Sequence, residues 1–282
     1  MIIDFHTHVF PEKIADSTIE ILSKKAHIIP HIRAVAPELI HSMKEAGVDL
    51  SVILPVATAE RQVVKLNDAA ARLNEQYRES GLFSFGCMHP DFADYSSELS
   101  RVKELGLAGI KLHPVYQGVD LDDIRFLRIL ERAAELSLLV VTHAGIDVGY
   151  PGVVHCSPKM CKNVVREIGS FPFVLAHMGG WKNWEEVPSL LSGTGVYLDT
   201  AFSTERMEPL PDGYWKESEL QMLSEDGFIE FVKAFGADHI LFGTDSPWTS
   251  QKRSRAFIEA LPLSDPEKQL ILGQNAEALL NL

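Results

Sequence analysis

The sequence predicts a single α/β domain, a (β/α)8 barrel of the TIM type that spans residues 1–282. The length is close to the roughly 250 residues that are typical of this fold. Eight short apolar runs alternate with longer amphipathic stretches, and buried parallel strands have this near-continuous apolar character. The expected strands lie at residues 2–6, 50–57, 82–89, 108–114, 138–145, 173–180, 195–201 and 239–247. An open, doubly wound sheet is the alternative.

The stretches between these runs predict helices that pack on the outside of the strands. Residues 59–81 and 121–137 are the clearest examples, because each combines an apolar stripe with charged residues on its other faces. Three further segments, 9–35, 146–158 and 201–225, are expected to be long loops that follow the first, fifth and seventh strands. In a barrel all three would rise on the C-terminal face, where the active sites of this fold lie.

Composition restricts the classes of partner and compartment. The chain has 39 acidic and 26 basic residues, a net charge of −13, and no cluster of Lys or Arg. Nucleic acids and anionic membranes are therefore poor candidate partners, and we expect a small-molecule substrate. Cys87, Cys156 and Cys161 cannot all pair within the chain, which favours free thiols in a reducing compartment. Because no signal-peptide pattern or long apolar run is present, we expect a cytoplasmic protein.

The first strand ends in a His-x-His motif formed by His6 and His8. Residues two apart on a strand point to the same side, so the two imidazoles should converge. Two convergent neutral imidazoles make half of a typical zinc site. The motif is weak on its own, because neighbouring histidines are more often surface or capping residues.

Three other expected strands also end in groups that can bind a metal. His143 ends the fifth strand, His177 the sixth and Asp245 the eighth. The C-terminal ends of barrel strands meet at one face of the barrel. Because polar groups that are buried together are costly unless they are paired or bound to a metal, these residues and the His-x-His motif predict a divalent metal site.

Four further residues are candidates for substrate binding, each with a structural alternative. Lys111 and His113 share one face of the fourth strand. Lys111 would anchor the substrate or pair with a buried aspartate, and His113 would face the site or cap the strand. His155, in the segment after the fifth strand, would contact substrate or have no role. Trp248 would wall the pocket or only pack against the core.

The combination of strand-end motifs resembles the amidohydrolase superfamily, and within it the amidohydrolase-related branch. The motifs are the His-x-His, GIKLHP, THAG, LAHMGG, FGTDSPW and the closing ILGQNAEALLNL, which together run from residue 3 to residue 282. This branch includes metal-dependent hydrolases and decarboxylases similar to aminocarboxymuconate semialdehyde decarboxylase.

The resemblance implies a role for each strand-end residue. One divalent metal, Zn²⁺ with Mn²⁺ as the alternative, would be held by four ligands: His6, His8, His143 and Asp245. Asp245 would also take the proton of a metal-bound water. His177 would be a general acid or base, or would polarise the substrate. Some superfamily members carboxylate a lysine of the fourth strand to bridge two metals, which leaves that role open for Lys111.

Our leading hypothesis from the sequence is a metal-dependent hydrolase of a small amide, ester or lactone. The alternative is a metal-dependent, non-oxidative decarboxylase of a small unsaturated or aromatic carboxylic acid, with His177 in the proton step. A barrel that has lost catalysis and serves as a scaffold is less favoured, because every ligand position is filled. A homodimer is an expectation from the family alone.

Overall fold

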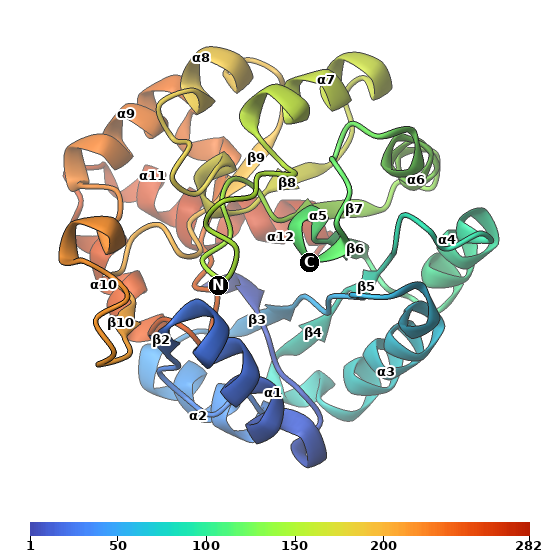
Figure 1. The fold of residues 1–282 in the computed structure, drawn as a ribbon. Helices are drawn as coiled ribbons and strands as arrows, with labels where there is room; N and C mark the ends of the chain where they lie inside the picture. The colour runs from blue at the N-terminus through green and yellow to red at the C-terminus, as the bar shows by residue number, and fades with distance from the viewer.

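The computed structural model describes residues 1–282 and consists of parallel strands enclosed by a ring of helices (Figure 1). The barrel strands are β1 (Ile3–Thr7), β3 (Leu50–Ile53), β4 (Leu82–Ser84), β5 (Gly86–Cys87), β6 (Gly109–Leu112), β7 (Leu139–Thr142), β8 (Phe173–Leu175), β9 (Tyr197–Asp199) and β11 (Ile240–Leu241). Each of the eight predicted strands overlaps one of these, with β4 and β5 sharing the third. The predicted barrel is confirmed.

The strands close on themselves through hydrogen bonds at two seams. The ladders run in the order β1-β3-β4 and β11-β9-β8-β7-β6-β5. Only Phe85 separates β4 from β5, so these two are halves of one strand that bonds to a different neighbour on each side. At the other seam, Phe5 N donates to Phe242 O at 2.8 Å, and Thr7 forms a parallel bridge with Ser246. This closure rules out the open-sheet alternative.

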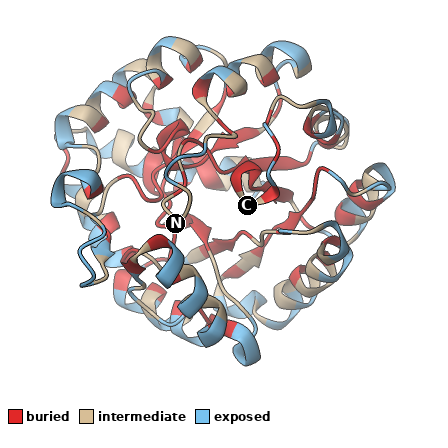
Figure 2. Cartoon of the chain, viewed as in Figure 1, coloured by how far each residue is buried: buried red, intermediate tan, exposed pale blue.

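The helices cover the outside of the barrel and turn their polar faces to solvent (Figure 2). They are α1 (Glu12–Ala26), α2 (Ala36–Ala46), α3 (Val63–Gln76), α4 (Tyr95–Glu104), α5 (Pro114–Gln117), α6 (Ile124–Glu135), α7 (Pro158–Ile168), α8 (Val187–Leu191), α9 (Glu225–Phe235), α10 (Gln251–Ala260), α11 (Asp265–Gln269) and α12 (Asn275–Leu280). Both predicted helical segments, 59–81 and 121–137, contain a helix, α3 and α6. No helix combines the length and the apolar character needed to cross a lipid bilayer.

Short helical turns complete the connections between these elements. They are the 3₁₀ turns η1 (Glu60–Gln62), η2 (Arg78–Ser80), η3 (His177–Gly179), η4 (Glu217–Leu220) and η5 (Ala237–His239), and the π-type turn η6 (Leu270–Gln274). The predicted helix α6 shows why the pattern succeeds. Phe126, Ile129, Leu130 and Ala133 are buried at spacings of three and four, so a single stripe faces the strands.

An apolar cluster fills the barrel interior. Its ten buried members are Ile3, Phe5, Val52, Leu54, Phe85, Leu139, Val141, Val174, Leu241 and Ala276. The rings of Phe5 and Phe85, from strands that are not neighbours, meet edge to face with centroids 5.8 Å apart. Ala276 belongs to α12, so this last helix packs against the same cluster. The polar strand-end residues follow the cluster along the strands and therefore rest on an apolar layer.

A β-bulge in β1 lets two consecutive side chains face the interior. Between Asp4 and Thr7 the register advances three residues while β3 advances two. Phe5 joins the interior cluster, and the next residue, His6, contacts Lys111 of β6 through its ring. Neighbours on a regular strand would point to opposite faces, so the extra residue of the bulge is what allows this arrangement.

Two of the long segments bind each other above the strand ends. Segment 9–35 contains α1 and β2 (Ile28–Ile29), and segment 201–225 contains β10 (Glu208–Pro209). β2 and β10 pair antiparallel, and Trp215 Nε1 donates to Ala26 O at 2.8 Å. The connection after the first strand is therefore held as a fixed part of the C-terminal face.

Asn275 fixes α12 to the start of β11 and offers a test of how the barrel is closed. Its buried amide donates to Ala237 O and Ile240 O, both at 2.8 Å. We expect Asn275→Ala to lower the free energy of unfolding by about 2 kcal/mol, because two main-chain carbonyls lose their donor. Urea denaturation followed by tryptophan fluorescence measures this change. Gln274→Ala, at the exposed neighbouring position, is the matched control, and equal midpoints for the two variants would contradict the role of Asn275.

Candidate active site

A cavity of about 340 Å³ opens at the C-terminal ends of the barrel strands. Its lining includes eight of the nine residues expected at the site: His6, His8, Lys111, His113, His143, His177, Asp245 and Trp248. His155 is not among the lining residues. Its Nδ1 contacts Asp120 Oδ1 at 2.6 Å on the outer part of the loop, so the structure does not bring this residue to the cavity.

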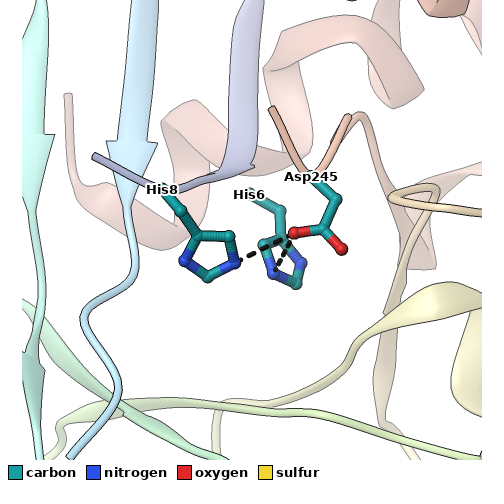
Figure 3. A group of neighbouring side chains, drawn as sticks. All are labelled: His6, His8 and Asp245. Atoms are coloured by element: carbon teal, nitrogen blue, oxygen red, sulfur yellow. Dashed lines mark ion pairs between the residues drawn. The ribbon is translucent and has the colours of Figure 1, made fainter. Parts of the chain in front are cut away.

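Three of the expected ligands converge at one point (Figure 3). Asp245 Oδ1 lies 2.9 Å from His8 Nε2 and 3.6 Å from His6 Nε2. Ligands of one tetrahedral metal with bonds of about 2.1 Å lie about 3.4 Å apart. One ligand atom from each residue lies within 4.8 Å of the others, so the spacing fits a shared cation.

The hydrogen bonds of these imidazoles determine which ring nitrogen is free. His6 Nδ1 contacts Asp199 Oδ2 at 2.8 Å, and His8 Nδ1 contacts Leu54 O at 2.8 Å. A carbonyl oxygen and an ionised carboxylate can only accept, so each Nδ1 carries the hydrogen. In the neutral rings, the lone pair is therefore on Nε2, the atom that faces Asp245. A metal-bound histidine has this state, with its other nitrogen donating to an oxygen.

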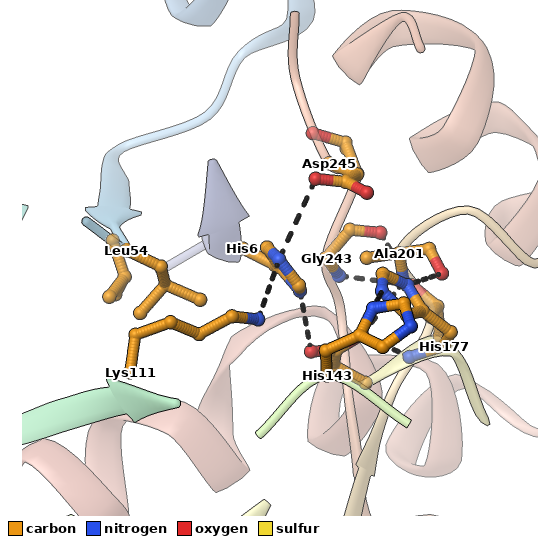
Figure 4. Close-up of polar contacts among 12 residues, drawn as sticks. His6, Leu54, Lys111, His143, His177, Ala201, Gly243 and Asp245 are labelled. Carbon is orange, nitrogen blue, oxygen red and sulfur yellow. Dashed lines mark hydrogen bonds and ion pairs between the residues drawn. The ribbon is translucent and has the colours of Figure 1, made fainter. Parts of the chain in front are cut away.

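A relay of hydrogen bonds assigns the same state to His143 (Figure 4). His177 Nδ1 donates to Ala201 O at 3.0 Å, which leaves a lone pair on His177 Nε2. His143 Nδ1 lies 3.0 Å from that atom and donates to it. The Nε2 of His143 then bears a lone pair, and it is buried without any hydrogen-bond partner. An unpartnered buried acceptor is costly, so this atom is suited to a cation.

His143 does not lie in the same tight group as the other three expected ligands. It is grouped instead with His113 and Asp147, whereas His177 is grouped with His6 and Asp199. The donor set as a whole still fits a divalent metal, because it presents three imidazole Nε2 atoms and one carboxylate around one cavity.

An unusual backbone conformation orients the side chains of Asp245 and His177. Asp245 and His177 have φ angles of 62° and 60°, in the left-handed region that non-glycine residues adopt rarely. Such conformations concentrate at functional sites, where the surrounding structure maintains them. Gly243 is needed beside them for space, because a Cβ there would lie 3.0 Å from the Cβ of His6.

Burial and charge set the ionisation of the central groups. Burial lowers the pKa of His6 to about 4, with Lys111 acting in the same direction, so the ring is neutral near pH 7. Burial alone would raise the pKa of Asp245, but the His6 and His8 rings beside it hold that pKa far below its usual range. Burial likewise opposes ionisation of Asp199, and its contacts with His6 and other neighbours keep its pKa low. Both aspartates are therefore carboxylates at neutral pH.

Lys111 is a fully buried cation at the centre of the site (Figure 4). Its Nζ lies 3.1 Å from His6 Nε2, and its side chain is 1% exposed. Burial lowers the pKa of Lys111 to about 8, and the carboxylates of Asp199 and Asp245 limit that decrease. The amine thus remains mostly protonated near pH 7 and can attract an anionic ligand.

Asp199 and Asp147 are residues of the candidate site that the sequence reasoning missed. Asp199 ends β9, inside the apolar run GVYLDTA, and an acidic residue in such a buried run was the available signal. Asp147 lines the cavity from the segment after β7, and burial raises its pKa to about 7. Its carboxylate lies 3.6 Å from His113 Nε2, while the His113 ring stacks on Tyr116. No motif distinguished Asp147 from other loop aspartates.

Comparisons with known proteins agree with this geometry. The family described as Amidohydrolase matches residues 3–282. One similar solved structure is the 5-carboxyvanillate decarboxylase of Novosphingobium aromaticivorans in complex with manganese and 4-hydroxy-3-methoxy-5-nitrobenzoic acid. It is 15% identical with a TM-score of 0.74, covering 100% of this chain and 96% of that one.

Two further structures are alike in fold. The 2,6-dihydroxybenzoate decarboxylase from Rhizobium is 15% identical with a TM-score of 0.69, covering 99% of this chain and 98% of its own. A TIM-barrel protein from Bordetella bronchiseptica is 18% identical with a TM-score of 0.72 and the same coverage. The comparison with curated proteins gives no match. The family match extends over almost the whole sequence and confirms the resemblance of the strand-end motifs: this chain belongs to the amidohydrolase family.

Proposed function

We propose that this protein is a metal-dependent, non-oxidative decarboxylase of an aromatic carboxylic acid. The observation that carries the proposal is the buried Lys111 ammonium beside the group formed by His6, His8 and Asp245. This arrangement offers a carboxylate-binding cation next to a site suited to a divalent metal, inside a cavity with many apolar lining residues. The decarboxylases among the structurally similar proteins support the same reaction.

Hydrolysis of an amide, ester or lactone was the leading hypothesis from the sequence, and it has less support. Both reactions could use the same ligand set, so that set does not distinguish them. A buried ammonium in an apolar cavity favours binding an anionic acid more than it favours activating water. The manganese in a similar decarboxylase supports Mn²⁺, the alternative to Zn²⁺ expected from the sequence, as a candidate metal. A homodimer and a cytoplasmic location stay predictions.

In this proposal the metal would be held by the Nε2 atoms of His6, His8 and His143 and by the carboxylate of Asp245. A bound divalent cation supplies Lewis acidity and positive charge for the oxygen atoms of an acid. Lys111 then binds and orients the substrate carboxylate through a charge-assisted hydrogen bond.

Decarboxylation breaks the bond between the ring carbon and the carboxylate, and CO₂ leaves. The ring carbon keeps the electron pair and takes up one proton, so no oxidant or reductant is required. We assign this step to His177: protonated on Nε2 from solvent between turnovers, it would give that proton to the ring carbon, while its Nδ1 stays fixed by Ala201 O. Apolar neighbours such as Trp181 and Phe202 limit the access of water to this proton.

The reaction is tested by following CO₂ release from a panel of hydroxybenzoates with the metal-loaded protein. We expect release by the wild type and a loss of about 100-fold or more in His177→Asn, because proton transfer by a positioned side chain contributes this much. Metal analysis should find about one metal per chain in both proteins. Cleavage of aryl esters or lactones without CO₂ release from any acid would instead support the hydrolase hypothesis.

The role of Asp199 in holding the metal site is tested separately by metal affinity. Its two oxygens accept from His6 Nδ1 and from the main-chain N of His177, at 2.8 and 2.9 Å. Asp199→Asn has only one accepting oxygen, so we expect metal affinity to fall about 10- to 100-fold. Competition with a chelator measures it. Asp212→Asn removes a similar but exposed contact, with His27 Nδ1, and should leave the affinity unchanged. Equal affinities in the two variants would contradict the assignment.

The preference for an acid over its neutral amide tests Lys111. We expect the wild type to bind 2-hydroxybenzoate more tightly than 2-hydroxybenzamide, and Lys111→Met to lose about tenfold or more of that preference. Calorimetric titration of the metal-loaded proteins measures both affinities. Lys182→Met is the control, since its Nζ bonds to Gln221 O and it does not line the cavity. An unchanged preference in Lys111→Met would remove Lys111 from carboxylate binding.

A further inference from the structure

Helix α1 forms an apolar wall on the side of the cavity away from the buried lysine. Ile14, Thr18 and Leu22 all line the cavity and are spaced four residues apart, so they occupy one face of the helix. Ile14 is 48% exposed, whereas Lys111 is 1% exposed. The cavity therefore runs from the charged strand ends to a rim that is built by α1.

The size of the cavity exceeds what a single aromatic ring requires. A protein cavity of about 150 Å³ is enough to hold benzene, and this cavity measures about 340 Å³. A ring bound with its carboxylate at Lys111 would leave about half of the space unfilled. The substrate should therefore carry a substituent that extends toward the rim.

The charges of the lining residues restrict the chemistry of that substituent. Lys111 is the sole lysine or arginine among the residues that line the cavity. The acidic residues that line the cavity are Asp147 and Asp245, and both are buried. A second carboxylate on the ligand would face apolar side chains and Asp147 without a cation to pair with. The substituent should be uncharged and apolar.

The wall is held in place before any ligand binds. The ammonium of Lys25, in the last turn of α1, lies 3.4 Å from the centroid of the Tyr150 ring. Ala26, the last residue of the helix, accepts a hydrogen bond from Trp215 Nε1 at 2.8 Å. Two other segments of the C-terminal face thus anchor α1, so its inner face has a fixed shape.

We propose that the substrate is an aromatic acid with an uncharged apolar substituent opposite its carboxylate, and that Ile14, Thr18 and Leu22 select this substituent. The orientation of the acid rests on the proposed function. The selection of the substituent by α1 is a property of ligand binding, so it can be measured as an affinity without any turnover.

The test is the affinity of 2-hydroxybenzoate and its 4-methyl, 4-ethyl, 4-propyl and 4-butyl homologues, measured by calorimetry on the metal-loaded protein. Burial of each methylene should tighten binding by up to about fourfold, so we expect a gain of more than tenfold across the series. Thr18→Trp fills the space in front of the wall. It should remove most of this increase in affinity, so it weakens binding of the 4-butyl homologue more than binding of 2-hydroxybenzoate.

Ser17→Trp is the matched control, because Ser17 is the exposed neighbour on the same helix and does not line the cavity. Ser17→Trp should show the same increase in affinity with the length of the 4-alkyl group as the wild type. Thermal denaturation of both variants shows whether each one is folded, and Thr18→Leu serves as a milder replacement if Thr18→Trp is not.

The outcomes separate this inference from the proposed reaction. An increase in affinity with the length of the 4-alkyl group that is lost in Thr18→Trp supports selection by the α1 wall, even if no acid loses CO₂. In that case only the proposed reaction fails. If 2-hydroxybenzoate loses CO₂ but affinity does not increase across the 4-alkyl series, the proposed selection by the α1 wall is wrong and the proposed reaction stands. Absence of binding for every homologue, or an equal loss for all of them in Thr18→Trp, also overturns the proposed selection.

Discussion

The carboxylate of Asp199 fixes the geometry of the site, because one buried group bonds two of its histidines at once. It accepts from the ring of His6, in the first strand of the barrel, and from the main chain of His177, which follows the sixth strand. A buried charge is tolerated only when its lone pairs are satisfied, and these two N–H groups provide that. The same contact gives the neutral His6 ring a lone pair on Nε2 and turns it toward the cavity.

The parts of the site that could be predicted from the sequence are those that follow strand periodicity. His6 and His8 converge because they are two apart, and Asp245 joins them because all parallel strands end at one face. The bulge that also brings Phe5 inward could not be predicted, since it depends on the register between β1 and β3. Asp199 was missed because its role arises from a contact 193 residues away in the sequence.

The sequence predicted where the long connections lie, on the C-terminal face of the barrel. It did not predict their secondary structure or which of their residues face the cavity. Segment 9–35 was expected only as a loop, but it contains α1, whose Ile14 and Leu22 face a cavity and not the core. His155 had been a candidate in segment 146–158, yet Asp147 of the same segment lines the cavity instead. Which loop residue points inward depends on how neighbouring loops pack. This information lies in tertiary contacts such as Trp215 with Ala26.

The charge balance of the centre favours one kind of ligand. With neutral imidazoles and a protonated Asp147, whose pKa burial raises to about 7, Asp199 and Asp245 contribute two negative charges and Lys111 one positive charge, which leaves the buried group at minus one. A divalent cation would change this to plus one, and a monoanionic acid would then bring it to zero. Because an uncompensated charge in a low-dielectric cavity is costly, a monoanion suits the metal-loaded site better than a dianion or a neutral ester. The strand-end residues thus favour a single carboxylate on the ligand, and the size of the remaining space is determined by the loops.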